Sequence, residues 1–152
     1  MKLFKRLIFL PLFPLLFAYP ETASCENWLK YEVVRDGSVL SYDKDSIADR
    51  TRHIKQIWFK REVSDQSREI LIKRMKAQGF PTAGYDKLSH HIVLFVINCK
   101  EKKYKALSTA DIDINGKELF RNSSIEQPNW EDVLSDNIMI YGLYEAACNP
   151  TP

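Results

Sequence analysis

The sequence predicts an α+β domain in which an antiparallel sheet of about six strands carries a C-terminal helix on one face. Six runs rich in β-branched and aromatic residues read as strands, and Asp36-Gly37 and Asn115-Gly116 separate two pairs of them. The last such run is followed by a segment with helical spacing near the C-terminus. Strands in series with helices in the middle and at the end favour an antiparallel sheet. The 152 residues suit one domain, and 45% hydrophobic residues suffice for a core.

The first two dozen residues have the pattern of an export signal. Three basic side chains lie within residues 2–6, and residues 7–18 (LIFLPLFPLLFA) contain no polar side chain. Twelve residues are too few to cross a bilayer as a helix, which needs about twenty. Small residues at 22–24 (TAS) then suit cleavage by signal peptidase. We therefore expect a signal peptide over residues 1–24 and a single domain over residues 25–152.

Cys25 leaves two alternatives open. Ordinary cleavage before Cys25 would release a soluble exported protein. Residues 22–25 (TASC) also loosely resemble a lipobox, in which Cys25 becomes the lipidated first residue. Contact with a membrane is expected only in the lipidated case.

The net charge of +2 belongs to the leader. The whole chain has 22 basic and 20 acidic residues. Cleavage of the expected signal peptide removes Lys2, Lys5, Arg6 and Glu21. Residues 25–152 thus carry 19 of each sign and have no formal net charge. A neutral domain gives no reason to expect nucleic acid as a partner.

Each predicted strand follows from a local pattern. Asp-Gly and Asn-Gly pairs supply the positive φ angles of a two-residue hairpin turn, which predicts two hairpins. The expected strands are residues 28–35, 38–42, 53–63, 90–99, 104–114 and 117–120.

The run 90–99 (HHIVLFVINC) predicts a central strand. Val93, Phe95, Ile97 and Cys99 point to one face, and the alternate positions are apolar as well. An apolar pattern on both faces is typical of a strand that is covered on both sides.

The C-terminal segment predicts a helix that covers the Cys99 face of this strand. Ile140, Tyr144 and Cys148 recur at four-residue spacing. Ser135 is the expected N-cap, and Pro150 stops the helix. A shorter helix is expected over residues 66–78 (QSREILIKRMKAQ), where Leu71 and Met75 share a face.

The three cysteines allow three pairs: Cys25–Cys99, Cys25–Cys148 and Cys99–Cys148. Export makes a disulfide feasible. If Cys25 is lipidated or free, Cys99–Cys148 remains, and it would stabilise the fold by roughly 4 kcal/mol on a chain-entropy model.

The sequence offers no constellation that argues for catalysis, a metal or a cofactor. His90 and His91 are neighbours on a strand and point to opposite faces, and His53 is isolated. The carboxylate pairs Asp43/Asp45 and Asp111/Asp113 adjoin turns, where solvated acids are common. The basic run 100–105 (KEKKYK) reads as a hairpin bend in water, and its alternative is contact with an acidic polymer. We therefore predict a protein that is not an enzyme.

Taken together, the parts of the chain resemble the surface-adhesin protein E-like domain of exported bacterial proteins. The matching elements, in order, are Trp28, 42–47 (YDKDSI), 57–60 (IWFK), 84–89 (GYDKLS), 97–99 (INC), 102–108 (KKYKALS), Trp130 and 145–148 (EAAC). The resemblance implies a mostly antiparallel sheet with a C-terminal helix held against it by a Cys99–Cys148 disulfide. It also implies the periplasm or cell surface of a Gram-negative bacterium, and an adhesin-like role towards host matrix or serum proteins. It assigns no binding residues.

Two functions remain as alternatives, beside a structural role. The first is a non-enzymatic envelope module that binds a protein or extracellular polymer through a sheet face or edge. The second is a small-ligand or enzyme-type domain with a pocket between sheet and C-terminal helix, lined by Phe95, Tyr141 and Tyr144 with His91 as a polar group. A structural or assembly subunit would require a homodimer or larger complex.

Overall fold

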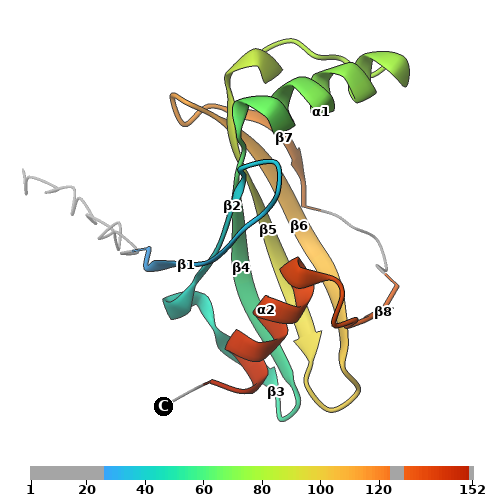
Figure 1. Ribbon diagram of the computed structural model, residues 1–152. Helices are drawn as coiled ribbons and strands as arrows, with labels where there is room; N and C mark the ends of the chain where they lie inside the picture. Colours follow the sequence, from blue (N-terminus) through green and yellow to red (C-terminus); the bar gives the residue numbers. More distant parts are fainter. Residues whose placement is uncertain (1–25, 124–128, 151–152) are drawn as a thin grey trace, which may run out of the picture.

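The computed structural model describes residues 26–123 and 129–150. These residues form an eight-stranded antiparallel sheet, two α-helices and two short 3₁₀ turns (Figure 1). In chain order the elements are β1 (Trp28–Val33), β2 (Val39–Asp43), η1 (Lys44–Ser46), β3 (Ala48–Thr51), β4 (Ile54–Glu62), α1 (Asp65–Ala77), η2 (Tyr85–Lys87), β5 (Leu88–Asn98), β6 (Lys103–Asp113), β7 (Glu118–Asn122), β8 (Glu131–Asp132) and α2 (Ile138–Cys148). The predicted fold class is confirmed. The predicted signal peptide and Cys25 lie outside the described residues.

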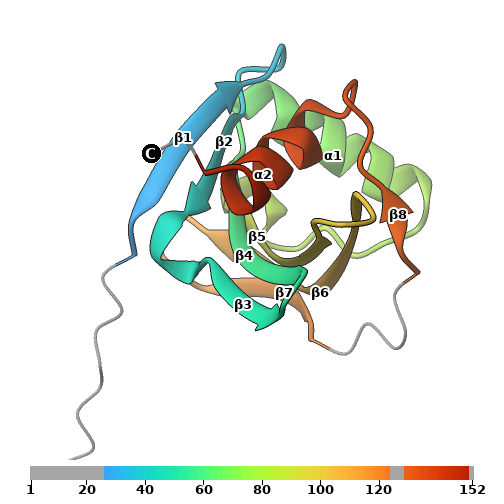
Figure 2. The same cartoon turned by 90° about the horizontal axis from the view of Figure 1, so that it is seen from below.

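The sheet has the strand order β1-β2-β4-β5-β6-β7, with β3 beside β4 and β8 beside β6. It curls around α2, as the view from below shows (Figure 2). We call the face that α2 covers the inner face, and the opposite one the outer face. Neither described helix has the length and hydropathy needed to span a bilayer.

The main core lies between the inner face and α2. Ile57 and Phe59 from β4 and Phe95 and Ile97 from β5 are buried there. The helix contributes a matching buried set, Ile140, Leu143, Tyr144 and Ala147. The predicted role of the C-terminal helix as a cover for the central strand is thus confirmed.

A disulfide fastens the end of α2 to the end of β5. It joins Cys99 and Cys148, whose Cα atoms are 5.5 Å apart. This is the pair that the family resemblance implies and one of the three that the cysteine count allows.

A second, smaller core lies under α1, which crosses the end of the sheet near β7 (Figure 1). Val63, Tyr85 and Leu88 are buried there, and Leu71 and Met75 from α1 pack against them. No residue of α1 itself is buried. The helix therefore covers an end of the sheet without forming part of the main core.

The outer face differs from the expectation that both faces of the central strand are covered. No described helix lies on it; Val96 of β5 is buried as expected, but Ile92 and Leu94 are only half-buried. Trp58 lies beside Leu94 in the register and shields part of this face. The apolar residues of the outer face are covered by neighbouring side chains rather than by another layer.

Both glycine turns are longer than the predicted two-residue form. Gly37 and Gly116 have positive φ angles of 79° and 78°, but Asp36 and Asn115 do not. A two-residue type I′ turn needs positive φ at both positions. The loop after β1 therefore closes through a hydrogen bond from Val34 N to Ser38 O at 3.0 Å.

Two short strands, β3 and β8, were not predicted. All four residues of β3 and both of β8 are exposed, so neither has an alternation of apolar and polar residues. Their hydrogen-bonding is imposed by the longer strands beside them, β4 and β6.

The helix starts are set by side-chain caps. Asn137 caps α2 by accepting a hydrogen bond from Ile140 N, so the helix begins two residues later than the predicted Ser135 cap would place it. Ser64 caps α1 by accepting from Ser67 N at 3.1 Å. Asp136 is consequently outside the first turn of α2.

Candidate functional site

The open edge of β1 is the starting point for a functional site. This strand pairs with β2 and with no other strand among residues 26–123 and 129–150. Val34 N–H bonds across the hairpin to Ser38 O, and N–H groups alternate in direction along a strand. Val33 N–H therefore faces the open side, where the Glu32 carboxylate accepts it at 3.1 Å. The edge thus offers backbone groups that only a local side chain occupies.

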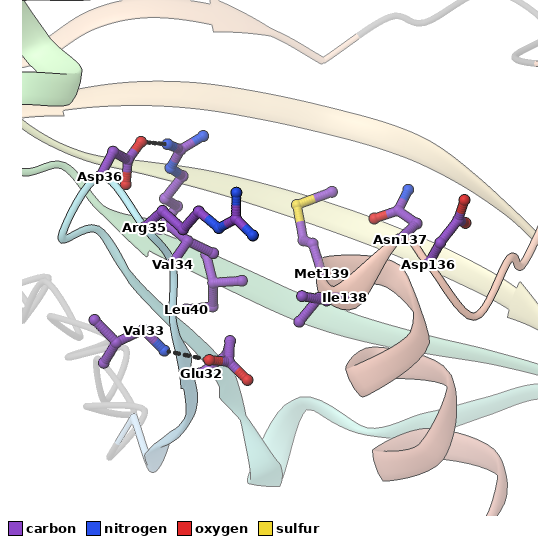
Figure 3. Close-up of a pocket in the computed structure, with 11 residues that line it drawn as sticks. Glu32, Val33, Val34, Arg35, Asp36, Leu40, Asp136, Asn137, Ile138 and Met139 are labelled. Carbon is purple, nitrogen blue, oxygen red and sulfur yellow. Dashed lines mark hydrogen bonds and ion pairs between the residues drawn. The ribbon is translucent and has the colours of Figure 1, made fainter.

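A hollow of about 680 Å³ lies between the β1–β2 hairpin and the start of α2. Figure 3 shows the hairpin side chains on one side and Asp136 to Met139 on the other. The described residues that line it are Glu32, Val33, Val34, Arg35, Asp36, Leu40, Arg61, Asp136, Asn137, Ile138 and Met139.

A second hollow, of about 630 Å³, continues along β1 and α2. It shares Glu32 and Ile138 with the first, so the two adjoin. Its lining includes Leu29 and Tyr31 from the strand and Tyr141 from the helix. We call the two hollows together the edge groove.

Tyr31 holds the strand and the helix together between these hollows. Its hydroxyl donates to Met139 O at 2.9 Å. Its ring packs so closely on α2 that a Cβ at Gly142 would lie 2.5 Å from Cε2. Burial and the nearby Glu32 carboxylate raise the pKa of Tyr31, so its hydroxyl stays protonated and donating.

An ion pair fixes the end of the groove near the hairpin turn. Arg61 Nη2 is 2.5 Å from Asp36 Oδ2, and the dashed line that starts at Asp36 in Figure 3 marks this ion pair. Partial burial alone would raise the pKa of Asp36, but hydrogen bonds from Ser38 and the Arg61 charge outweigh it and lower the pKa. Asp36 is therefore ionised near neutral pH, and the hairpin is held in one position against β4.

Apolar side chains line both walls of the edge groove and remain accessible. Leu29 and Val33 on β1 and Ile138 and Tyr141 on α2 are all exposed. Exposed large apolar side chains gathered at one place mark interaction surfaces, whereas scattered ones need no explanation. The groove thus combines an open strand edge with apolar walls.

The predicted pocket between sheet and C-terminal helix does not form from its four named residues. Phe95 and Tyr144 are buried in the main core, and Tyr141 faces the edge groove. His91 lies near α1, at the other end of the sheet. The interface under α2 is filled by side chains where the pocket was expected.

The histidines lie where strand alternation predicts, on opposite faces, but His91 has a partner that the sequence does not reveal. Its Nδ1 is 2.5 Å from Asp111 Oδ1, and the Tyr85 hydroxyl donates to Asp111 Oδ2 at 2.7 Å. His91 and Asp111 are 20 residues apart and meet because β5 and β6 pair in that register. Only the strand register could have revealed this contact.

Asp45 is an exposed acid beside a turn, as the sequence predicts, whereas the other three carboxylates differ from solvated turn acids. Asp43 and Asp113 are buried and accept hydrogen bonds from turn backbone N–H groups, including Asp45 N at 3.0 Å and Lys117 N at 2.8 Å. Asp111 lies within β6, away from any turn. The turn role is therefore right for Asp43 and Asp113, and the expected exposure is wrong.

The basic run 100–105 spans the bend from β5 to β6, as predicted. Lys100 is exposed, and Lys105 lies 4.7 Å from the ring centre of Trp130. Tyr104 donates to Glu131 at 2.6 Å, and burial together with this carboxylate raises the pKa of Tyr104 to about 12. Part of the run thus packs against the segment around β8.

In the part of the chain that the structure describes, no group of three or more His, Cys, Asp or Glu side chains could hold a metal ion.

Comparison with known proteins gives one distant likeness in fold. No family model matches the chain, and no curated protein matches it. Among solved structures, protein E from non-typeable Haemophilus influenzae is similar, with 13% sequence identity over 82% of this chain and 85% of that chain, and a TM-score of 0.43. At this identity and TM-score, no functional residue is transferred from one chain to the other.

Proposed function

We propose that this protein is an exported, non-enzymatic binding domain that takes an extended segment of a partner protein at the open edge of β1. The observation that carries the proposal is the position of this edge beside the edge groove. An added strand would hydrogen-bond to β1 and place its side chains against α2. This mode of recognition draws affinity from main-chain hydrogen bonds and specificity from the pockets beside them.

The backbone of β1 supports strand addition at a defined position. Val33 N–H turns to the open side, and its present acceptor is the carboxylate of the half-buried neighbour Glu32, in a hydrogen bond that lies at the surface. An incoming carbonyl can replace this carboxylate without breaking any hydrogen bond between β1 and β2. The exchange costs little because the displaced carboxylate returns to water.

The groove supports recognition of apolar side chains along that segment. Alternate residues of an extended chain point to the same side. The two adjoining hollows therefore fit successive side chains on the α2 side of the added strand. Glu32 and Ile138, which line both hollows, mark the point where they meet.

Export is supported by the disulfide, because such bonds persist in oxidising compartments. We place the protein in the periplasm or at the cell surface of a Gram-negative bacterium. The family resemblance found in the sequence suggests a host matrix or serum protein as the partner.

A peptide screen tests the proposal directly. The purified oxidised protein is panned against a random peptide library and a panel of matrix and serum proteins, and retained peptides are titrated by NMR. We expect amide shift changes concentrated on β1 and α2. Retention of no ligand at micromolar concentration, or shifts centred on the β7 edge, would contradict the proposal.

Two variants with matched controls sharpen the test. Val33→Pro removes the outward N–H while leaving the pairing with β2, and we expect loss of peptide binding. Val33→Ile keeps both the N–H and an apolar β-branched side chain, and we expect it to retain binding. Ile138→Ser removes an apolar wall residue that is 53% exposed, and should weaken binding about three- to tenfold. Ile114→Ser, at a residue 66% exposed outside the groove, should leave binding unchanged.

A further inference from the structure

A separate cavity of about 550 Å³ lies between α1 and the inner face of the sheet, away from the edge groove. Its volume is in the range of small-molecule sites. Most of its wall is apolar, and the polar groups are confined to Tyr85, His91 and Asp111. The apolar lining residues on the helix, the following loop and β7 are Leu71, Met75, Phe80, Pro81, Ala83, Leu119 and Phe120.

The three polar side chains are linked by hydrogen bonds, with Asp111 between Tyr85 and His91. Asp111 accepts from Tyr85 at one oxygen and from His91 Nδ1 at the other, at 2.7 and 2.5 Å. Desolvation alone would raise the pKa of Asp111, but these two hydrogen bonds outweigh it and lower the pKa, so the carboxylate is ionised. An ionised carboxylate accepts and cannot donate, which assigns the proton to Nδ1 of His91. We take His91 as the neutral imidazole, in which Nε2 is then an acceptor; no described residue hydrogen-bonds to it.

The mouth of this cavity carries accessible aromatic rings. Phe80 and Phe120 line it and are both largely exposed. His91 and Asp111 are more enclosed, with 25% and 13% of their side chains exposed. An apolar ligand would cover the two rings and reach the free nitrogen of His91.

We infer that this cavity binds a small apolar molecule with a single hydroxyl group, which donates its hydrogen bond to Nε2 of His91. The neutral His91 requires a donor from the ligand, because its Nδ1–H is already committed to Asp111. A ligand carboxylate would add a second desolvated negative charge beside Asp111. A ligand ammonium would be buried among apolar side chains, with both oxygens of Asp111 already engaged. The site is independent of the proposed peptide groove.

The test uses thymol and thymol methyl ether as probes of the purified, oxidised protein at neutral pH. They share one apolar body, and only thymol can donate a hydrogen bond. We expect thymol to bind about three- to tenfold more tightly, the value of one neutral hydrogen bond. His91→Ala should remove this difference, whereas His90→Ala, on the opposite face, should preserve it.

A second variant tests whether both probes occupy the cavity, independently of the hydrogen bond to His91. Ala83→Trp places a large ring at an exposed residue that lines the cavity, and should abolish binding of both probes. Amide NMR spectra of each variant report whether the fold is kept. Binding of neither probe to the wild-type protein, equal affinity for both, or an unchanged thymol preference in His91→Ala would overturn the inference.

Discussion

Gly142 lies in the interior of α2, where helix propensity would favour almost any other residue. A Cβ at this position would lie 2.5 Å from Cε2 of Tyr31 and 2.7 Å from its Cδ2. The glycine is therefore required by the close approach of β1 to the helix, and it explains why a residue that weakens an isolated helix occurs here.

Gly142→Ala should consequently destabilise the protein, although Ala is the better helix former by about 1 kcal/mol. Displacing the Tyr31 ring costs about 1–3 kcal/mol by overpacking, which outweighs that gain. We expect a net loss in the free energy of unfolding, measured by urea denaturation. In a Tyr31→Ala background the same change should stabilise the protein, and equal effects in both backgrounds would contradict the packing argument.

Asp111 gives a second prediction at the residue scale. In Asp111→Asn the amide NH₂ group replaces one of the two oxygens that accept from Tyr85 and His91, so a donor faces a donor. We expect the free energy of unfolding to fall by about 1–3 kcal/mol at neutral pH. Because the pKa of Asp111 is lowered in the folded state, its stabilising effect is present above the ordinary value of 3.8 and is lost as the pH falls below it.

The difference in stability between wild type and Asp111→Asn should therefore shrink in acid below that pH. Thermal unfolding followed across a pH series measures it. Asp86→Asn, at an exposed carboxylate, is the control and should track the wild type at each pH. A difference that stays constant into strong acid would show that Asp111 does not act through its charge.

At the scale of elements, α2 is held in place by two independent means. Four of its side chains are buried in the main core, and a disulfide fixes its last residue to the end of β5. The covalent link acts mainly on the unfolded chain, because it closes a loop between positions separated by 49 residues.

Cys148→Ser should therefore lower the free energy of unfolding by roughly 4 kcal/mol without removing the buried contacts of α2. Urea denaturation of the variant should agree with that of the reduced wild type. Cys25→Ser should leave stability unchanged, because the disulfide joins the other two cysteines. A loss of similar size in Cys25→Ser would mean that pairing differs in the native protein.

The elements that the sequence predicts best are those with a strong local pattern. The apolar run of β5 and the four-residue spacing of apolar residues in α2 were sufficient to predict these two elements, because each marks a segment that packs in the core. The run did not reveal that the outer face of β5 has no described helix over it. The exposed strand β3 has no such pattern and exists only because β4 offers it a partner. The edge groove and the His91–Asp111 contact depend on register and on the approach of distant segments, which local patterns do not encode.

At the scale of the whole molecule, the two helices differ in how extensively they pack against the sheet. The helix α2 fills the concave side of the curled sheet, whereas α1 rests across one end and buries none of its own residues (Figure 2). Local opening requires less free energy where few apolar contacts are lost.

Native-state hydrogen exchange should consequently rank the elements. We expect the amides of β4 and β5 to exchange most slowly, those of α2 to be nearly as protected, and those of α1 to exchange faster than those of α2. Ser64→Ala removes the cap of α1, costing about 1 kcal/mol, and should speed exchange in α1 and in the β1–β2 turn, where the Ser64 hydroxyl donates to Asp36 O. Protection of α1 equal to that of β5 would contradict this order.

The position of α2 as the last element in chain order has a consequence for biosynthesis. Until residues 138–148 have been made, Leu40, Ile57 and Phe59 have no helix to cover them. A nascent chain can pair its strands but presents an open apolar face, which holdase chaperones and proteases recognise. Closure of the main core by α2 and formation of the Cys99–Cys148 disulfide both require residues 138–148. The disulfide therefore cannot form before this helix is present, and it fixes the helix over a face that the strands alone leave open.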